Sequence, residues 1–426
     1  MTSQDLIGQR IKTIRRQRGL SQAQLAHPEL SDSYVSLIES GKRTPTAAVL
    51  ELLATKLDCS LTYLVNGVTA DQMEELDFSL RYAALALENG EVAEARRRYA
   101  ELLANDNIAG LVTLRQQAEY GYALATEACG ELDEAIETLS RLRVADPPPT
   151  PERRVAIVLA LCRCYRDRGQ LFHAVEVAED VLAGPERPVW TDGLVELGAT
   201  LLGAYFVRGD LLRARQFSAE LLAAAESLGS PRANVAACWN AAVVAQCTGH
   251  VEESLQLIDR ALAVQSEYGE PRNLARLRIQ AAALRLPHDP AEARDMLRRA
   301  RRQLSETSAS TVDFAWVTYY LAQAEYLLGN AATAAELARE ATDALDDRTG
   351  AVRVETRLML ANALMAQGRG QEARKELALA EELLEKVPVR SATAAGGWMN
   401  VATAMERVDV EAGVAAYQRA LACAGL

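Results

Sequence analysis

The segment ENGEVAEARRRYAELL, residues 88–103, places a glycine between two stretches that have the apolar spacing of a helix, and it recurs along the chain. Related segments include ACGELDEAIETLSRL (128–142) and VRGDLLRARQFSAELL (207–222). The turn position returns every 39 to 41 residues, at Gly90, Gly130, Gly169, Gly209, Gly249, His288, Gly329, Gly368 and Arg407. Five residues after each turn comes a small side chain: Ala95, Ala135, Ala174, Ala214, Ser254, Ala293, Ala334, Ala373 or Ala412.

This period predicts a stack of helical hairpins. Two helices meet at each glycine turn, and the small side chain lets their backbones approach closely. Each hairpin then leaves an apolar face that the next hairpin covers. Nine copies account for residues 74–426, so the sequence predicts an α-solenoid over most of the chain.

The first 66 residues read differently, as five short helices with brief connections. Ser21 and Ser31 stand at expected N-caps, and Gly41 stands where a left-handed C-cap is expected. Pro45 is expected at a first helical position, with Thr44 as its cap. The predicted organisation is a small helical domain at 1–66, a linker at 67–73 and the repeats at 74–426.

Charge separates the same two parts. The chain carries a net charge of −12, but residues 1–66 hold eight Lys/Arg against six Asp/Glu. RIKTIRRQR (10–18) alone contains five basic residues. A basic head on an acidic body indicates that the head is the part that meets a polyanion.

Several classes of protein find no support in the sequence. No apolar run approaches the roughly 20 residues that span a bilayer, and MTSQDLIGQR lacks the apolar core of a secretory signal. The seven cysteines have no framework spacing, which favours reduced thiols in a cytoplasmic protein. We find no catalytic motif, metal-ligand spacing or phosphate-binding glycine loop, and we expect no cofactor and no enzyme activity.

Three segments of the head together resemble the helix-turn-helix of the phage-repressor or Xre-like family: LSQAQLA (20–26), LSDSYVSLIESGKRTP (30–45) and CSLTYLVNG (59–67). The connection HPEL departs from the family's glycine-containing turn. The resemblance implies that Asp32, Ser33 and Ser36 contact bases in the major groove. It implies backbone contacts for Gln22, Tyr34, Lys42 and Arg43, and a structural ion pair between Arg15 and Glu39. Asp32 can instead serve its own helix by placing a negative charge at the N-terminus.

The repeats resemble tetratricopeptide repeats with a lengthened period. The fold class is therefore all-α, a five-helix head followed by a right-handed solenoid of about nine hairpins. In such solenoids the first helix of each hairpin lines a concave groove. Reading positions 10, 6 and 3 before each turn, plus one position a turn earlier, gives the expected effector-groove residues: Tyr120, Arg163, Arg166, Trp239, Gln246, Arg278, Arg285, Trp316, Tyr319, Gln323, Tyr326 and Asn362. This mixture suits a peptide, although the aromatic rings can instead be packing between repeats.

The combination of head and repeats resembles the peptide-sensing, quorum-sensing type of transcription regulator in Gram-positive bacteria. The resemblance implies a homodimer that binds operator DNA and responds to a short peptide or another small effector. Two alternatives stay open. The repeats could recruit a partner protein without a small ligand, or the chain could act like headless relatives that are phosphatases of response regulators.

Overall fold

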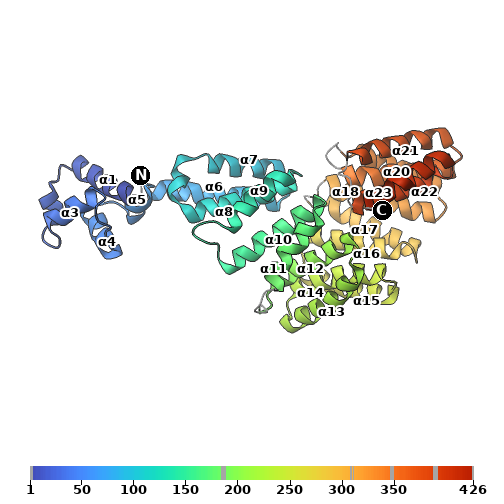
Figure 1. The fold of residues 1–426 in the computed structure, drawn as a ribbon, viewed down its shortest axis with the longest axis horizontal. Coiled ribbons are helices and arrows are strands. Elements are labelled where there is room, and N and C mark those ends of the chain that lie inside the picture. The colour runs from blue at the N-terminus through green and yellow to red at the C-terminus, as the bar shows by residue number, and fades with distance from the viewer. Residues whose placement is uncertain are drawn as a thin grey trace. The chain divides into compact units, whose positions relative to one another are not determined.

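The structure is a computed structural model that describes residues 3–183, 189–307, 309, 311–345, 350–386 and 392–424, and these residues contain helices and no strand. The chain divides into two compact units, Met1–Cys129 and Gly130–Leu426. Figure 1 shows the succession of helices along the chain. The division falls inside the second repeat, whereas the sequence placed its boundary at the end of the head.

The head contains the five expected helices: α1 (Ser3–Gln17), α2 (Gln22–Ala26), α3 (Asp32–Glu39), α4 (Ala47–Lys56) and α5 (Leu61–Asn66). Hydroxyl side chains cap four of them by accepting a backbone N–H of the first turn, at Ser21, Ser31, Thr46 and Ser60. The core is aliphatic, with Ile11, Leu25, Val35, Ile38, Leu53, Leu57 and Leu64 at 1% exposure or less. Local capping and a small apolar core thus define this domain.

Two sequence-based boundaries are corrected. The cap of α4 is Thr46, and the helix begins at Ala47, so neither Thr44 nor Pro45 has its expected role. The expected linker at 67–73 is mostly helical, because α6 (Ala70–Glu88) begins inside it. Thr69 caps that helix in a reciprocal arrangement with Gln72.

The rest of the first unit holds α6, α7 (Val92–Leu103), the short 3-10 helix η1 (Asp106–Gly110) and α8 (Val112–Ala128). A β-carbon added at Gly121 of α8 would lie 2.2 Å from the Tyr99 ring carbon Cζ. Tyr99 is 4% exposed. The glycine therefore makes room for a large buried ring between α7 and α8.

The second unit continues the alternation of first and second helices. Its first helices are α10 (Pro151–Asp167), α12 (Asp192–Arg208), α14 (Pro231–Cys247), α16 (Pro271–Arg285), α18 (Thr311–Leu327), α20 (Gly350–Ala366) and α22 (Ala392–Met405). Its second helices are α9 (Leu132–Arg143), α11 (Leu171–Leu182), α13 (Leu211–Leu228), α15 (Val251–Tyr268), α17 (Pro290–Ser305), α19 (Ala331–Asp343), α21 (Gly370–Glu385) and α23 (Val410–Ala424). Successive helices pack against each other along the unit.

The repeated small side chains lie where the sequence pattern places them. From Ala95 to Ala373, all eight residues that follow a turn by five positions are 0% exposed. In the ninth copy the buried small residue is Gly413, and Ala412 is only partly buried. The close approach of two helices in each hairpin rests on this position.

The turns are of two kinds. The seven glycines at the turn position have φ between +74° and +88°, the left-handed region that favours glycine, and the connections around them are two or three residues long. Where His288 or Arg407 takes the place of glycine, the connection has four residues, 286–289 or 406–409. At 286–289 the preceding helix, α16, ends one residue earlier relative to the turn position, and at 406–409 the following helix, α23, begins one residue later.

Candidate nucleic-acid interface and effector cavities

Helix α3 presents a polar face and buries an apolar one. Ser31 caps the helix by accepting the N–H of Tyr34, and its hydroxyl lies 3.2 Å from that of Ser33. Asp32, Ser33 and Ser36 are exposed. Val35 and Ile38, on the other face, are 0% and 1% exposed. The three residues expected to contact bases thus share the open side of one short helix.

Glu39, at the end of α3, ties three helices together. Arg15 of α1 donates from Nε to Glu39 Oε1 at 2.5 Å and from Nη2 to Oε2 at 3.0 Å. Gln22 of α2 donates from Nε2 to Oε2 at 2.8 Å. Burial raises the pKa of the Glu39 carboxyl, but these hydrogen bonds and the positive charge of Arg15 outweigh it and leave the pKa below its usual value. Gln22, expected at the DNA backbone, thus commits one amide N–H to Glu39.

The end of α3 carries exposed cations. Lys42 and Arg43 are exposed, and the Arg43 guanidinium lies 5.2 Å from the centre of the Tyr34 ring. Tyr34 itself packs against the head's core. Tyr34 and Arg43 therefore form a cation–π pair beside the open face of α3.

Other basic residues of the head have internal roles. Arg10 donates to the backbone oxygens of Leu64 and Val65, at 3.2 and 2.6 Å. Lys56 Nζ donates to the His27 oxygen at 2.6 Å, at the end of α2. Arg18 pairs with Asp58. The basic excess of the head therefore overstates the charge that is available to a polyanion.

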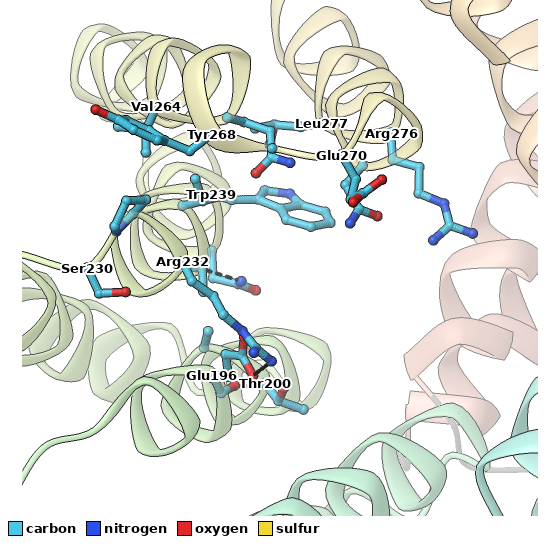
Figure 2. Close-up of a pocket in the computed structure, with 18 of the residues that line it drawn as sticks. Glu196, Thr200, Ser230, Arg232, Trp239, Val264, Tyr268, Glu270, Arg276 and Leu277 are labelled. Carbon is cyan, nitrogen blue, oxygen red and sulfur yellow. Dashed lines mark hydrogen bonds and ion pairs between the residues drawn. The ribbon is translucent and has the colours of Figure 1, made fainter. Parts of the chain in front are cut away.

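The second unit holds a cavity of about 870 Å³, here named the Trp239 cavity. Residues of α10, α12, α14 and α16 line it, together with the end of α15 and the segment 269–270. Figure 2 shows the Trp239 ring among the labelled residues, with Arg232 and Glu196 on one side and Tyr268 on the other. A cavity of this size accommodates a small organic ligand or a few residues of a peptide.

Its lining combines ion pairs, amides and aromatic rings. Arg232 of α14 pairs with both oxygens of Glu196 on α12, with 2.8 Å from Nη2 to Oε2. Asn240 also lines the cavity and donates from Nδ2 to the oxygen of Ala236 at 3.0 Å, so its side-chain oxygen remains an available acceptor. Arg276 also lines the cavity and donates from Nε to Asp313 Oδ1 of α18 at 2.7 Å. The cavity is thus linked by an ion pair to the following hairpin.

A second cavity, of about 320 Å³ and here named the Tyr319 cavity, lies among α18, α20 and α22. It brings together four of the expected groove residues: Tyr319, Gln323, Tyr326 and Asn362. Arg163 and Trp239 lie together at the Trp239 cavity. The expected groove residues thus gather at two separate places.

The remaining expected groove residues lie outside both cavities. Three of them are arginines that bond to neighbouring side chains: Arg166 to Asp167, Arg278 to Gln303 and Arg285 to Asp259. The Nε2 atom of Gln246 lies 3.5 Å from Nε2 of His288, and the Trp316 ring stacks on that of Tyr320. Tyr120 belongs to α8, in the first unit. For Arg278 the cause is the four-residue turn after α16. Because the helix ends one residue early, the position equivalent to Trp239 is Leu277, and Leu277 lines the Trp239 cavity.

Sequence reasoning missed a second group of lining residues: Glu196, Arg232, Asn240, Tyr268, Glu270 and Arg276. Apart from Asn240, in the middle of α14, they lie in the first half of a first helix, directly before it, or at the end of the preceding second helix. One signal in the sequence marks this place. The pattern Gly-x-Pro-Arg occurs at 229–232 and again at 269–272, one repeat apart, and it brings Arg232 to the cavity wall.

Within the part of the chain that the structure describes, no group of three or more His, Cys, Asp and Glu side chains is arranged to hold a metal ion. No helix among the described residues has the length and apolar character needed to cross a bilayer. None of the seven cysteines, all within the described residues, forms a disulfide, and burial raises the pKa of the Cys162 thiol to about 12.

These features define the class of protein: a helix-turn-helix domain followed by a solenoid of helical hairpins. Residues 11–64 match the family described as helix-turn-helix. The immunity repressor protein of Bacillus phage phi105 is 36% identical over 74 residues, which are 17% of this chain and 51% of that protein. The chain therefore spans about half the length of the curated relative that it matches.

Two solved structures have a similar fold over most of the chain. The apo form of the quorum sensor NprR from B. thuringiensis is 11% identical with a TM-score of 0.53, over 88% of this chain and 97% of that one. The Rap protein complexed with competence and sporulation factor is 13% identical with a TM-score of 0.55, over 83% of this chain and 98% of that one. At such identities the likeness concerns the fold alone.

Proposed function

We propose that the protein is a sequence-specific DNA-binding transcription regulator whose repeats bind a short signalling peptide or another small effector. The observation that carries the proposal is the union of a helix-turn-helix domain with the Trp239 cavity, whose charged, amide and aromatic lining suits a peptide-like ligand. The alternative, a DNA-bound adaptor for a partner protein, does not require this cavity. The quorum sensor with a similar fold supports the choice of a signalling ligand.

In this proposal the open face of α3 enters the major groove. Asp32, Ser33 and Ser36 are short and exposed, so they reach base edges without holding the helix away from the groove. Lys42 and Arg43 bind phosphates at the end of the helix. The ion pair of Glu39 with Arg15 sets the angle at which α3 is presented.

The DNA part is tested with a duplex selected from a randomised pool by the full-length protein. Replacing both Ser33 and Ser36 by alanine is expected to weaken binding to the selected duplex by about 1–3 kcal/mol and to spare binding to unrelated DNA. Arg43→Ala is expected to weaken both and to lower the salt slope by about one. Thr55→Ala is the control, because its exposed hydroxyl on α4 bonds only to the Glu51 oxygen. Equal affinity of the double variant for the selected duplex would remove α3 from the proposed interface.

Regulation requires two copies. One helix-turn-helix domain contacts a single half-site, so we expect a homodimer on a two-half-site operator. An effector in the Trp239 cavity shifts DNA binding only if it favours one arrangement of the dimer over the other. The Arg276–Asp313 ion pair gives such a ligand a contact to the next hairpin.

The effector part is tested by native mass spectrometry of the full-length protein mixed with the low-molecular-weight fraction of its host's culture. The expected result is a bound mass that is lost in Trp239→Ala and retained in Tyr268→Phe, which keeps the ring at the cavity's edge. The same fraction should alter affinity for the selected duplex. An unaltered bound mass in Trp239→Ala would place the ligand elsewhere.

A further inference from the structure

The Tyr319 cavity contains a carboxyl group whose surroundings differ from those of the neighbouring acids. Glu355 of α20 accepts a hydrogen bond at Oε2 from the Tyr319 hydroxyl at 3.2 Å, and Gln323 Nε2 donates to that hydroxyl at 2.7 Å. Asn400 of α22 also bonds to the carboxyl. Among the described residues, no Lys, Arg or His forms an ion pair with Glu355. Its partners are neutral hydroxyl and amide groups.

The buried acids nearby form ion pairs with arginines. Asp313, at 8% exposure, is held by Arg276 and Arg272, and Glu325, at 4%, is held by Arg298 at 3.1 Å. A buried carboxylate normally acquires such a cation, because an unpaired charge in a low-dielectric site is costly. Burial accordingly raises the pKa of the Glu355 carboxyl. The cavity beside it leaves space for a cation, and no Lys, Arg or His among the described residues forms an ion pair with this carboxyl.

The rest of the lining indicates what kind of cation fits. The walls include the rings of Tyr319 and Tyr326, whose faces attract a positive charge. Asn362 and Asn400 offer amide oxygens, which can accept the N–H groups of an ammonium that Glu355 leaves unbonded. Leu358 and Met359 provide an apolar part. An ammonium on a short apolar ligand matches these groups.

One further charge lines the cavity. Arg407, just after α22, is exposed and forms no ion pair with the described residues. It repels a simple amine, but it can bind a carboxylate on the same ligand. The cavity thus offers one unpaired acid and one unpaired base within a space of about 320 Å³.

We propose that the Tyr319 cavity binds a free amino acid with an apolar side chain, with its ammonium at Glu355 and its carboxylate at Arg407. This site is separate from the Trp239 cavity and does not depend on the effector proposed there. In this proposal the ligand binds among the first helices of the last three hairpins, α18, α20 and α22.

The test is isothermal titration calorimetry of the full-length protein with three matched probes. L-leucine carries both charges, 3-methylbutylamine carries the ammonium alone, and 4-methylpentanoate carries the carboxylate alone. The expected order of affinity is leucine, then the amine, then the acid. Absence of binding by leucine, or an amine that binds as tightly as leucine, would overturn the proposal. The dipeptide Leu-Leu supplies the two charges further apart, and tighter binding of it than of leucine would exclude a free amino acid.

Variants assign the two charges separately. Glu355→Gln is expected to weaken leucine and the amine by about tenfold or more, because the ammonium then meets a neutral amide. Arg407→Ala is expected to reduce leucine to the affinity of the amine and to leave the amine no weaker. Glu336→Gln, on the exposed side of α19, is the control and should bind like the wild type. Helical content by circular dichroism establishes that each variant is folded, and leucine binding unchanged in folded Glu355→Gln contradicts the proposal.

Discussion

The head buries Glu39 against Arg15, whereas the last hairpins hold the half-buried Glu355 beside hydroxyl and amide groups. In the head, hydrogen bonds and the arginine charge outweigh burial and keep the pKa of Glu39 low. In the hairpins burial prevails and raises the pKa of Glu355. The first arrangement fixes the geometry of a small domain, and the second leaves a charge open to a ligand.

The two regions also begin their helices differently. Helices α2 to α5 of the head start at Ser or Thr side chains that accept a backbone N–H. Seven second helices of the repeats, from α7 to α21, start directly after a left-handed glycine turn without a side-chain cap. Local hydrogen bonds thus stabilise the head, while buried small residues between helices stabilise the repeats.

The largest expected effect is in the head. Glu39→Ala leaves the Arg15 guanidinium buried without its partner and should cost roughly 3–5 kcal/mol of the free energy of unfolding. Urea unfolding followed by hydrogen exchange of α1–α5 measures it. Replacing both residues, as Arg15→Met with Glu39→Leu, is the control and should cost less. A single variant as stable as the wild type would contradict the structural role of the pair.

A smaller effect is expected from filling the space between α7 and α8. Gly121→Ala places a β-carbon 2.2 Å from the Tyr99 ring, so the ring must move, at a cost of about 1–3 kcal/mol. The control is Gly396→Ala in α22, where a β-carbon meets no atom within 4 Å. The control should be stabilised by up to about 1 kcal/mol through helix propensity. If the two changes had the same sign in thermal unfolding, close packing at Gly121 would not be the cause.

The difference in helix capping predicts a third, still smaller contrast. Ser60→Ala removes the hydroxyl that accepts the Tyr63 N–H at 3.1 Å and should cost about 1 kcal/mol. Gln170→Ala, at the start of α11, removes no cap and should change stability by less than about 0.5 kcal/mol. Urea unfolding of both variants makes the comparison, and equal losses would show that the repeats also rely on local caps.

The smallest expected effect is a difference in pH dependence. Because the pKa of Glu355 is raised in the folded state, its contribution to stability is present below the unfolded value of about 4.3 and is lost as pH rises through the folded value. Wild type should therefore lose stability relative to Glu355→Gln between about pH 4 and neutrality. For Glu39 the sign is opposite, since its lowered pKa gives stability that is lost on acidification. Hydrogen exchange of α20 at two pH values measures the first difference, and parallel profiles would exclude it.

Local and periodic signals predicted most of the fold. The five head helices follow from their capping residues, and the hairpins follow from the glycine and alanine positions. The start of α4 was wrong because Thr44 and Thr46 are both suitable caps on either side of Pro45. The beginning of α6 inside the expected linker was missed because polar residues there form the exposed first turn of a helix.

The cavities were less predictable. A fixed count backward from each turn finds Arg163 and Trp239, but it selects Arg278 where the structure has Leu277. Residues at the start of the first helices, such as Glu196 and Arg232, face the same space from the neighbouring hairpin, and no count within one repeat finds them. Whether these residues bind a ligand stays a prediction.

The two turns that lack glycine bear on how such a chain can be rearranged. A left-handed glycine sets the path of each short connection, and the four-residue connections 286–289 and 406–409 reach the next helix without one. A deletion or duplication of whole copies that joins one glycine turn to another keeps the same kind of connection, but one that joins a glycine turn to 286–289 or 406–409 does not. We therefore expect the seven hairpins with glycine turns to tolerate such exchanges better than the sixth and the ninth, which have their own connections.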